Sequence, residues 1–391
     1  ARRLPGRFRS LNPSAMKFRL FALLLCLAAS APAWTAEKAA AQANDAPPAW
    51  LAWIPVQNGY YDPARQSWAI SPPARPQNDD ERHPFSRNGL APARHNGKYG
   101  YIDTHGKWKI KPQYDAAAPF SENHLAVVRK DKRDIYINEK GQKAFKMTFA
   151  QAGSFGANQL AIARQDGLSG FLDAQGQWKI AARFARARPF APNGLAAASS
   201  GQAPDQWGYI NASGAWAIPA KFDSAGDFAA NGLAPASQGG KHGFLDQRGN
   251  WAVPAQFEQA RPFAANGLAR AQQNGKWGYV NAFGRWVIPV HFDEADDFEA
   301  NGLAGAKQNG LAGYLNERGD WAIAAQFTEV SPFENRPWAK VIQSKTELPG
   351  FIDARGQWIV RQDRVCGQTV VKNAGDEIIW PRKFSAACDK K

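Results

Sequence analysis

Apolar and polar residues follow one another in a short pattern that recurs from Gly59 almost to the end of the chain. Each copy contains Gly-aromatic-aliphatic-Asp/Asn, then a Gly three residues after the Asp or Asn, then Trp-x-Ile or a close variant. Clear copies begin at Gly100, Gly170, Gly208, Gly243, Gly278, Gly313 and Gly350, and degenerate copies begin at Gly59 and Ile135. The commonest step is 35 residues, a period typical of tandem repeat architectures.

Each copy predicts three short strands: the segment after Leu-Ala, the Gly-aromatic-aliphatic segment and the Trp-x-Ile segment. Trp108 and Ile110 are two residues apart, so both fall on one face of the third strand. Asp103 and Gly106 predict a tight turn before it. The Asp side chain can accept a hydrogen bond from the backbone two residues on, and Gly readily adopts positive φ.

One such unit is too small to be stable alone, so we expect the copies to stack on their neighbours. The Trp of the third strand recurs and is expected to fill the shared core, at Trp108, Trp178, Trp216, Trp251, Trp286, Trp321 and Trp358. The two ends of the array are expected to be exposed. We predict an all-β fold of three-stranded repeats in an open solenoid or superhelical array. A β-propeller is the alternative, which three strands per unit and nine copies fit less well.

These residues resemble the bacterial WG-repeat family, whose copies read Trp-Gly-Tyr-Ile-Asp, then Gly, Trp-x-Ile, Phe and Gly-Leu-Ala. The resemblance covers residues 59–360. The Trp that gives the family its name is present at Trp207 and Trp277 and is replaced in other copies by Tyr99, Ser169, His242, Ala312 or Pro349. The resemblance implies a β-rich array used for binding or scaffolding, and it brings no known reaction or catalytic residue.

The regions outside the repeats predict export. Residues 16–33 have Lys17 and Arg19, an apolar run and the small-residue end Ala31-Pro-Ala33, which is typical of a secretory signal peptide. We therefore expect a periplasmic or secreted bacterial protein with no transmembrane segment after cleavage. We divide the chain into an upstream segment (1–15), the signal peptide (16–33), a linker with a partial unit (34–58), nine repeats (59–363) and a C-terminal cap (364–391).

Two cysteines remain after the signal peptide, Cys366 and Cys388. In an exported chain they are expected to form a disulfide, which would stabilise the cap by about 3 kcal/mol in the chain-entropy model.

The chain has a formal net charge of +14, which falls to +8 without residues 1–33, because these contain six Lys and Arg and no Asp or Glu. The basic residues are scattered with no run of four, so we interpret them as a solvated surface and expect no nucleic-acid partner.

Sequence motifs of catalysis are missing: there is no His-Glu-x-x-His, Gly-x-Ser-x-Gly, Walker loop or dinucleotide fingerprint. We therefore predict no catalytic residue, no metal site and no cofactor. One acidic cluster could offer oxygen ligands to a hard cation, although a solvated acidic face is the stronger interpretation. It comprises Asp293, Glu294, Asp296, Asp297 and Glu299.

The residue before the Gly varies between copies, and a variable position is where a binding face could differ. Tyr99, Trp207, His242 and Trp277 are therefore the candidate ligand-binding residues, with a structural role as the alternative. We predict a non-catalytic binding or scaffold protein whose partner is a protein or a cell-envelope glycan. The alternatives are an enzyme acting on peptidoglycan or polysaccharide, and a structural spacer.

Overall fold

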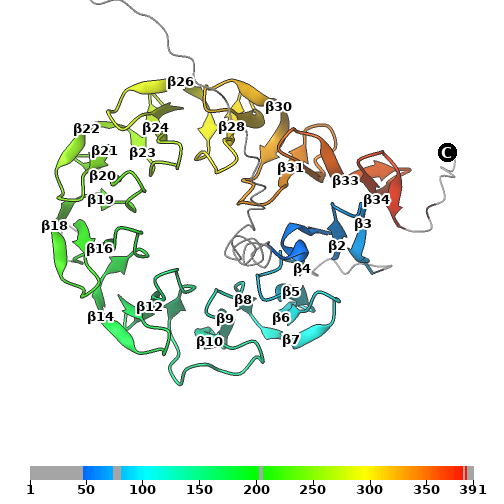
Figure 1. Cartoon of the computed structure of the whole chain (residues 1–391), viewed down its shortest axis with the longest axis horizontal. Coiled ribbons are helices and arrows are strands. Elements are labelled where there is room, and N and C mark those ends of the chain that lie inside the picture. Colours follow the sequence, from blue (N-terminus) through cyan, green and yellow to red (C-terminus); the bar gives the residue numbers. More distant parts are fainter. Residues whose placement is uncertain (1–46, 74–80, 202–205, 382–383, 385–391) are drawn as a thin grey trace, which may run out of the picture. The chain divides into compact units, whose positions relative to one another are not determined.

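The computed structural model describes residues 47–73, 81–201, 206–381 and 384, and Figure 1 shows the whole chain. The predicted signal peptide and Cys388 lie outside these residues, so cleavage and the disulfide stay predictions. The described part of the chain forms a short 3-10 helix, η1 (Ala49–Ala52), and the strands β1 to β35. Neighbouring strands in every sheet are antiparallel, which confirms the all-β prediction.

Most sheets have four strands, in chain order. Five of this kind are β4 (Glu81–Arg82) β5 (Ala91–His95) β6 (Lys98–Ile102) β7 (Trp108–Tyr114); β11 (Gln151–Ala152) β12 (Ala161–Gln165) β13 (Leu168–Leu172) β14 (Trp178–Phe184); β15 (Arg186–Ala187) β16 (Ala196–Ser199) β17 (Trp207–Ile210) β18 (Trp216–Phe222); β19 (Ser224–Ala225) β20 (Ala234–Gln238) β21 (Lys241–Leu245) β22 (Trp251–Phe257); and β23 (Gln259–Ala260) β24 (Ala269–Gln273) β25 (Lys276–Val280) β26 (Trp286–Phe292).

Three further sheets complete the described part of the chain. The three-stranded sheets are β1 (Ile54–Val56) β2 (Gly59–Asp62) β3 (Ser67–Ile70) and β8 (Ala116–Ala117) β9 (Ala126–Lys130) β10 (Arg133–Ile137). The nine-stranded sheet is β27 (Glu294–Ala295) β28 (Ala304–Gln308) β29 (Leu311–Leu315) β30 (Trp321–Val330) β31 (Ala339–Gln343) β32 (Pro349–Ile352) β33 (Trp358–Val365) β34 (Gln368–Asn373) β35 (Ile378–Trp380).

The first strand of each four-stranded sheet is the one that the sequence did not predict. It has only two residues, as in β19, where Ser224 pairs with Ser237 and Ala225 pairs with Ala236. Two residues are too few to show the alternation that identifies a strand. The prediction of three strands per unit therefore missed one.

The predicted turns are confirmed. Asp103 Oδ1 accepts hydrogen bonds from the backbone N–H groups of His105 and Lys107, and Gly106 has φ of 75°. A different glycine explains why the pattern begins with Gly. At Gly208 a Cβ would lie 2.4 Å from the carbonyl oxygen of Ile218, because β17 and β18 come close at a register shift. Only a residue without a side chain allows this approach.

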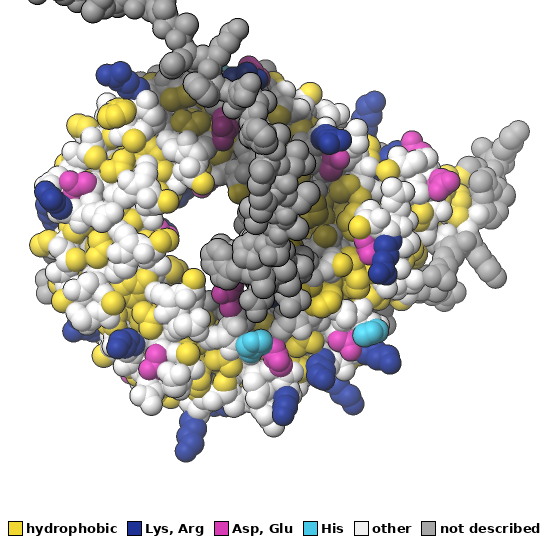
Figure 2. Space-filling view, viewed as in Figure 1, with side chains coloured by type: hydrophobic (Ala, Val, Ile, Leu, Met, Phe, Trp, Pro, Cys, Tyr) yellow, Lys and Arg dark blue, Asp and Glu magenta, His cyan; other side chains and the backbone are white. Residues whose placement is uncertain are grey.

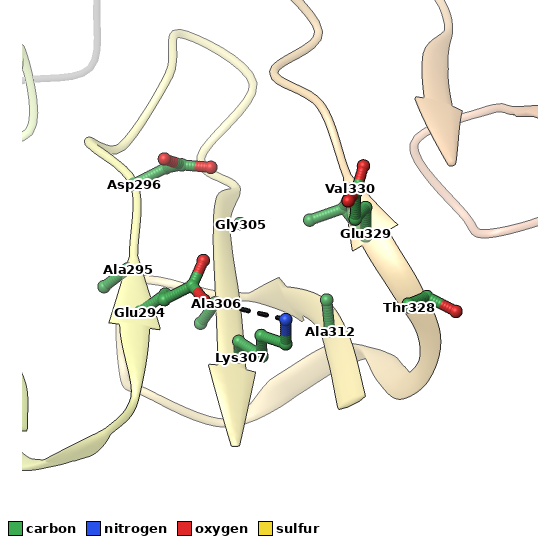
Figure 3. Close-up of a pocket in the computed structure, with 10 residues that line it drawn as sticks. All are labelled: Glu294, Ala295, Asp296, Gly305, Ala306, Lys307, Ala312, Thr328, Glu329 and Val330. Atoms are coloured by element: carbon green, nitrogen blue, oxygen red, sulfur yellow. Dashed lines mark ion pairs between the residues drawn. The ribbon is translucent and has the colours of Figure 1, made fainter. Parts of the chain in front are cut away.

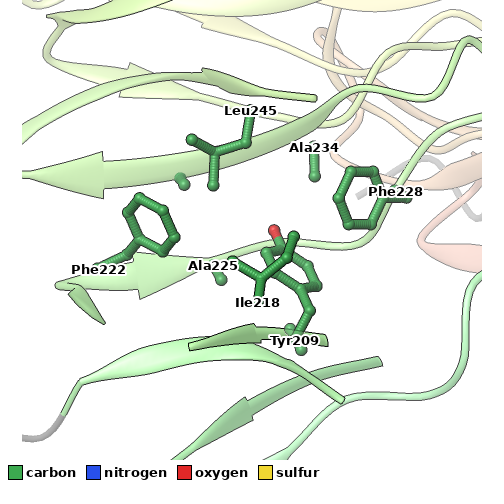
Figure 4. Close-up of a cluster of buried hydrophobic side chains, with 9 residues drawn as sticks. Tyr209, Ile218, Phe222, Ala225, Phe228, Ala234 and Leu245 are labelled. Carbon is green, nitrogen blue, oxygen red and sulfur yellow. The ribbon is translucent and has the colours of Figure 1, made fainter. Parts of the chain in front are cut away.

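Buried clusters between successive sheets form the core. Side chains of adjacent residues in a strand point to opposite faces, so Tyr209 packs against the following sheet and Ile210 against the preceding one. Figure 4 shows the first of these clusters, in which Tyr209 and Phe222 meet Phe228 and Leu245. Each sheet thus contributes to two clusters.

The recurring Trp lies nearer the surface than predicted. It starts the third long strand of its unit, and in six of the seven copies it packs edge-to-face on a Phe of the preceding unit, as Trp251 does on Phe222 with ring centroids 5.7 Å apart. Trp216 is 40% exposed, and the other Trp residues at this position are partly exposed. The prediction that they fill the core is therefore wrong in its degree of burial. The fully buried aromatic is the one that follows the Gly, at Tyr60, Tyr101, Tyr136, Phe171, Tyr209, Phe244, Tyr279 and Tyr314.

Where this buried aromatic is Tyr, its hydroxyl donates a hydrogen bond to a backbone carbonyl of the next unit. Tyr209, for example, bonds the carbonyl oxygen of Gly226 at 2.9 Å. The same bond is made by Tyr101, Tyr136, Tyr279 and Tyr314, each to the residue 17 positions later. Units are thus joined by polar as well as apolar contacts.

The first and last sheets contact each other, although the sequence predicted exposed ends. Ile54 and Tyr61 share a buried cluster with Phe351 and Val371. The indole N–H of Trp68 donates to the carbonyl oxygen of Ile379 at 3.1 Å, and Figure 1 shows β3 beside β34. A second indole, of Trp338, donates to the carbonyl oxygen of Ala52 at 2.8 Å.

Candidate functional site

The residue directly before the repeated Gly occupies what we call the pre-glycine position. The four predicted ligand-binding residues all lie there, in β6, β17, β21 and β25, and each faces the last aromatic of its own sheet across the strand pair. The pairs are Tyr99 with Tyr114, Trp207 with Phe222, His242 with Phe257, and Trp277 with Phe292. The structure does not bring the four into one site, and their role in binding stays a prediction.

Arginines cover the aromatic residues at this position. The guanidinium carbon of Arg270 lies 5.5 Å from the ring centroid of Trp277, and Arg270 Nε is 2.8 Å from Asp297 Oδ1. Arg186 lies 5.4 Å from the ring centroid of Trp207 in the same way. Cation–π contact stabilises such pairs, so these rings are partly covered on one face.

His242 differs because it titrates. Burial is the main cause that lowers the pKa of its imidazole, Arg261 lowers it further, and Asp223 acts in the opposite direction. The neutral form is therefore favoured in the folded protein.

Small residues at the pre-glycine position coincide with pockets. Ser169, Ala312 and Pro349 each line a cavity between their own unit and the next. Where a large ring stands in other units, these residues leave space. The size of the residue at the varying position therefore contributes to how much space is left between two units.

The arginine pocket lies between β11 to β13 and β15, with a volume of about 540 Å³. Ser169, which is only 3% exposed, stands at the pre-glycine position. Arg164 and Arg188 approach from neighbouring sheets, and Trp207 contributes an indole ring. The full lining is Gln151, Ala152, Gly153, Ile162, Arg164, Ser169, Arg186, Ala187, Arg188 and Trp207.

The acidic pocket, of about 290 Å³, lies at the corresponding place between β27 to β29 and the end of β30 (Figure 3). Glu294 and Asp296 line one side, Glu329 faces them, and Lys307 Nζ is 3.6 Å from Glu294 Oε1. Burial raises the pKa of the Asp296 carboxyl, and Arg270 opposes that shift. The remaining lining residues are Ala295, Gly305, Ala306, Ala312, Thr328 and Val330.

A third pocket, of about 410 Å³, lies where the first and last sheets meet. Pro349 and Phe351 line it together with Val56 and Arg82, so residues far apart in the sequence form one wall.

The acidic cluster that the sequence singled out is divided among local contacts. Asp293 pairs with Lys276 and also accepts a backbone hydrogen bond from Asn309. Glu299 accepts backbone N–H groups from the next unit, of Phe333 at 2.6 Å and Glu334 at 2.5 Å. Within the residues that the structure describes, no three His, Cys, Asp or Glu side chains form a group able to hold a metal ion.

The residues that give the pockets their charge were not among the predicted site residues. Arg164, Arg188 and Glu329 stand at positions whose identity changes from copy to copy, as the pre-glycine position does. An alignment of the nine copies would have shown Ser169 and Ala312 as the two smallest side chains at the pre-glycine position, which holds Asn58, Tyr99, Asp134, Ser169, Trp207, His242, Trp277, Ala312 and Pro349. On the face drawn in Figure 2, basic and acidic side chains are interspersed.

In the part of the chain that the structure describes, no helix combines the length and the apolar character needed to cross a membrane.

Comparison with protein families gives one match. The model for the WG containing repeat matches seven segments that together make up more than half of the chain: residues 99–133, 136–168, 170–201, 207–241, 243–277, 277–311 and 313–344. These segments leave out the copies at Gly59 and Gly350. No curated protein matches the chain.

Among solved structures, the chain is similar to a crystal structure of the eukaryotic initiation factor, with a TM-score of 0.55 and 11% identity over 81% of this chain and 93% of that one. It is also similar to the dihydro-heme d1 dehydrogenase NirN in complex with DHE, with a TM-score of 0.43 and 10% identity over 83% and 72%. A third is the Cps50 (Swd1) β-propeller domain of Myceliophteria thermophila, with a TM-score of 0.36 and 10% identity over 62% and 98%. The first likeness concerns the fold alone, and the two lower scores carry no argument.

Proposed function

Since the chain belongs to the WG containing repeat family, we propose that it is an exported, non-catalytic binding or scaffold protein that presents pockets between its units to a protein or a cell-envelope glycan. The observation that carries the proposal is the pre-glycine position. Ser169 and Ala312 open pockets at places where Trp207 and Trp277 put a large ring. The export part rests on the signal-like residues 16–33.

Binding is the function that this arrangement supports best. Each unit keeps the same backbone, so a change at one position alters a pocket without altering the fold. The arginine pocket falls within the range of about 300–1,000 Å³ typical of small-ligand sites. An enzyme, by contrast, brings a set of unlike residues together at one point of the molecule.

We propose in addition that the array closes on itself as a β-propeller, which was the alternative to the open solenoid. Four strands per sheet support this, because propeller blades have four. The described residues form nine clusters between units, and the ninth joins the first unit to the last. Nine units in an open row would have one interface fewer than the nine that a closed ring has.

The test is to fill the pockets. In the full chain, Ser169→Trp and Ala312→Trp introduce the side chain that Trp207 and Trp277 have at the same position, so the scaffold can accept it. Val287→Trp, at an exposed position of β26, is the matched control. Binding of each protein to purified peptidoglycan, to envelope polysaccharide and to envelope proteins is measured as a function of concentration.

We expect saturable binding to one fraction that at least one filled variant loses and the control keeps. Binding that both filled variants retain would refute the role of the pockets. Absence of saturable binding to every fraction would favour a structural spacer, and turnover of a glycan by the wild type would favour an enzyme.

A further inference from the structure

We propose that the arginine pocket binds a carboxylate-bearing sugar, such as a uronic acid unit of an acidic glycan. The inference rests on the proposed binding function and adds the chemical class of the ligand. The described lining of the pocket contains three arginines and no Asp or Glu, although acids and bases are interspersed on the face drawn in Figure 2.

The guanidinium groups are placed to receive an anion. Arg164 extends from β12 and is partly exposed, while Arg188 follows β15 of the next sheet and is exposed. Arg164 Nη2 donates one hydrogen bond, of 2.7 Å, to the carbonyl oxygen of Gly167. A guanidinium has five N–H donors, so this bond orients the group and leaves donors for a ligand. Outside the pocket lining, burial raises the pKa of the Asp227 carboxyl, and Arg188 opposes that shift.

Comparison of the two equivalent pockets shows how their charges differ. Counted from the repeated Gly and Phe, Gln151 of the arginine pocket corresponds to Glu294 of the acidic pocket, and Gly153 corresponds to Asp296. Arg186 corresponds likewise to Glu329. Arg164, by contrast, has the basic counterpart Lys307. The described lining therefore carries three basic residues in the arginine pocket, and three acidic residues with one basic residue in the acidic pocket. The two pockets therefore select ligands of opposite charge.

The neighbours of the arginines favour a sugar acid over a bare anion. A carboxylate is planar and matches the fork of a guanidinium with two parallel hydrogen bonds. Beside the arginines, the Trp207 ring, which Arg186 contacts on one face, adds apolar surface of the kind that can contact the C–H face of a pyranose. Ser169 and Gln151 add polar groups for sugar hydroxyls. The volume of about 540 Å³ exceeds what a phosphate or an acetate would fill.

The probes for the test are glucuronate, glucose and inorganic phosphate, each titrated into the full chain by calorimetry at low salt. Glucose keeps the ring and lacks the charge, and phosphate keeps the charge and lacks the ring. Arg164→Gln with Arg188→Gln removes the two anchoring charges. Arg248→Gln with Arg355→Gln is the matched control, because both residues lie in exposed turns and the net charge changes equally.

We expect saturable glucuronate binding that is at least ten-fold tighter than that of glucose and of phosphate. Each guanidinium lost should weaken it about ten-fold, since charge-assisted hydrogen bonds are worth that factor or more. The control pair should bind as the wild type does. Ser169→Trp should abolish binding, and the Arg pair decides the matter if that variant does not fold by circular dichroism.

Phosphate that binds as tightly as glucuronate would overturn the sugar assignment. Glucuronate binding that survives in the Arg164 and Arg188 variant, or no glucuronate binding at all, would overturn the inference. The proposed function fails separately, when no envelope fraction responds to the filling of either pocket.

Discussion

The hydroxyl of Tyr209 offers a direct measure of how strongly two units are joined. It donates to the carbonyl oxygen of Gly226 in the next unit at 2.9 Å, while its ring lies in the cluster of Figure 4. Tyr209→Phe removes the hydroxyl and keeps the ring, so no cavity forms. Phe already stands at the equivalent position in three other units, at Phe171, Phe244 and Phe351.

The expected loss follows from the burial of the two partners. A hydrogen bond contributes about 0.5–1.5 kcal/mol net, and more when its removal leaves a fully buried group unsatisfied. Tyr209 is fully buried, whereas Gly226 is only partly buried, so water can reach the freed carbonyl. We therefore expect Tyr209→Phe to lower the free energy of unfolding by about 1 kcal/mol.

The reverse change supplies the matched comparison. Phe244→Tyr places a hydroxyl where the carbonyl of Arg261, again 17 residues later, occupies the equivalent position. We expect it to raise the free energy of unfolding by up to about 1 kcal/mol. With a slope of about 3 kcal/mol per molar urea, each change shifts the unfolding midpoint by about 0.3 M.

Urea unfolding followed by Trp fluorescence measures both midpoints. Because repeat arrays need not unfold in one step, hydrogen exchange at the amides of β17 to β20 should locate the change at this interface. An unchanged midpoint for Tyr209→Phe together with a lowered one for Phe244→Tyr would refute the reasoning, since it would mean that the hydroxyl does not join the units.

Three further outcomes are expected. Since burial lowers the pKa of His242, the folded state resists protonation, so wild-type stability should fall as the pH drops below about 6.5. The stability of the wild type relative to His242→Gln, measured by thermal melts from pH 8 to 5, should therefore decrease toward low pH. A relative stability that does not change with pH would contradict this. Gly208→Ala should unfold the protein or cost several kcal/mol, because its Cβ would meet the Ile218 carbonyl oxygen at 2.4 Å, whereas Gly375→Ala should be tolerated, as circular dichroism will show. Glu299→Ala should lower the free energy of unfolding, measured by urea unfolding, by about 1–2 kcal/mol, since it removes the acceptor of two backbone N–H groups. Glu299→Gln keeps an acceptor oxygen, so an equal loss in that variant would contradict this explanation.

The features that repeat were the ones that the sequence could predict. The turn at Asp103 and Gly106 and the long strands recur with local signals, so they were found without knowledge of tertiary contacts. The strand Ser224–Ala225 was missed because it is defined only by its pairing with β20. The depth of Trp216 was also misjudged, since its place at the edge of a sheet depends on strand order.

The pockets were missed for a different reason. Binding residues are predicted from side chains that offer a ring or a polar group, as Trp207 and His242 do. Ser169 and Ala312 contribute because their small side chains leave a cavity, and that cavity is formed only when the neighbouring unit supplies its other wall. The arginines around Ser169 come from two sheets, and their convergence depends on the packing of one unit on the next.

The connection between one unit and the next is a single residue at several junctions. Phe222 ends β18 and Ser224 begins β19, and the N–H of Asp223 between them donates to the carbonyl oxygen of Ser237 at 2.9 Å. In the nine-stranded sheet the corresponding strand is continuous, since β30 pairs with β29 along its first part and with β31 along its last residues. Neighbouring units are therefore coupled through the main chain as well as through their side chains, and the opening of one unit should loosen the next.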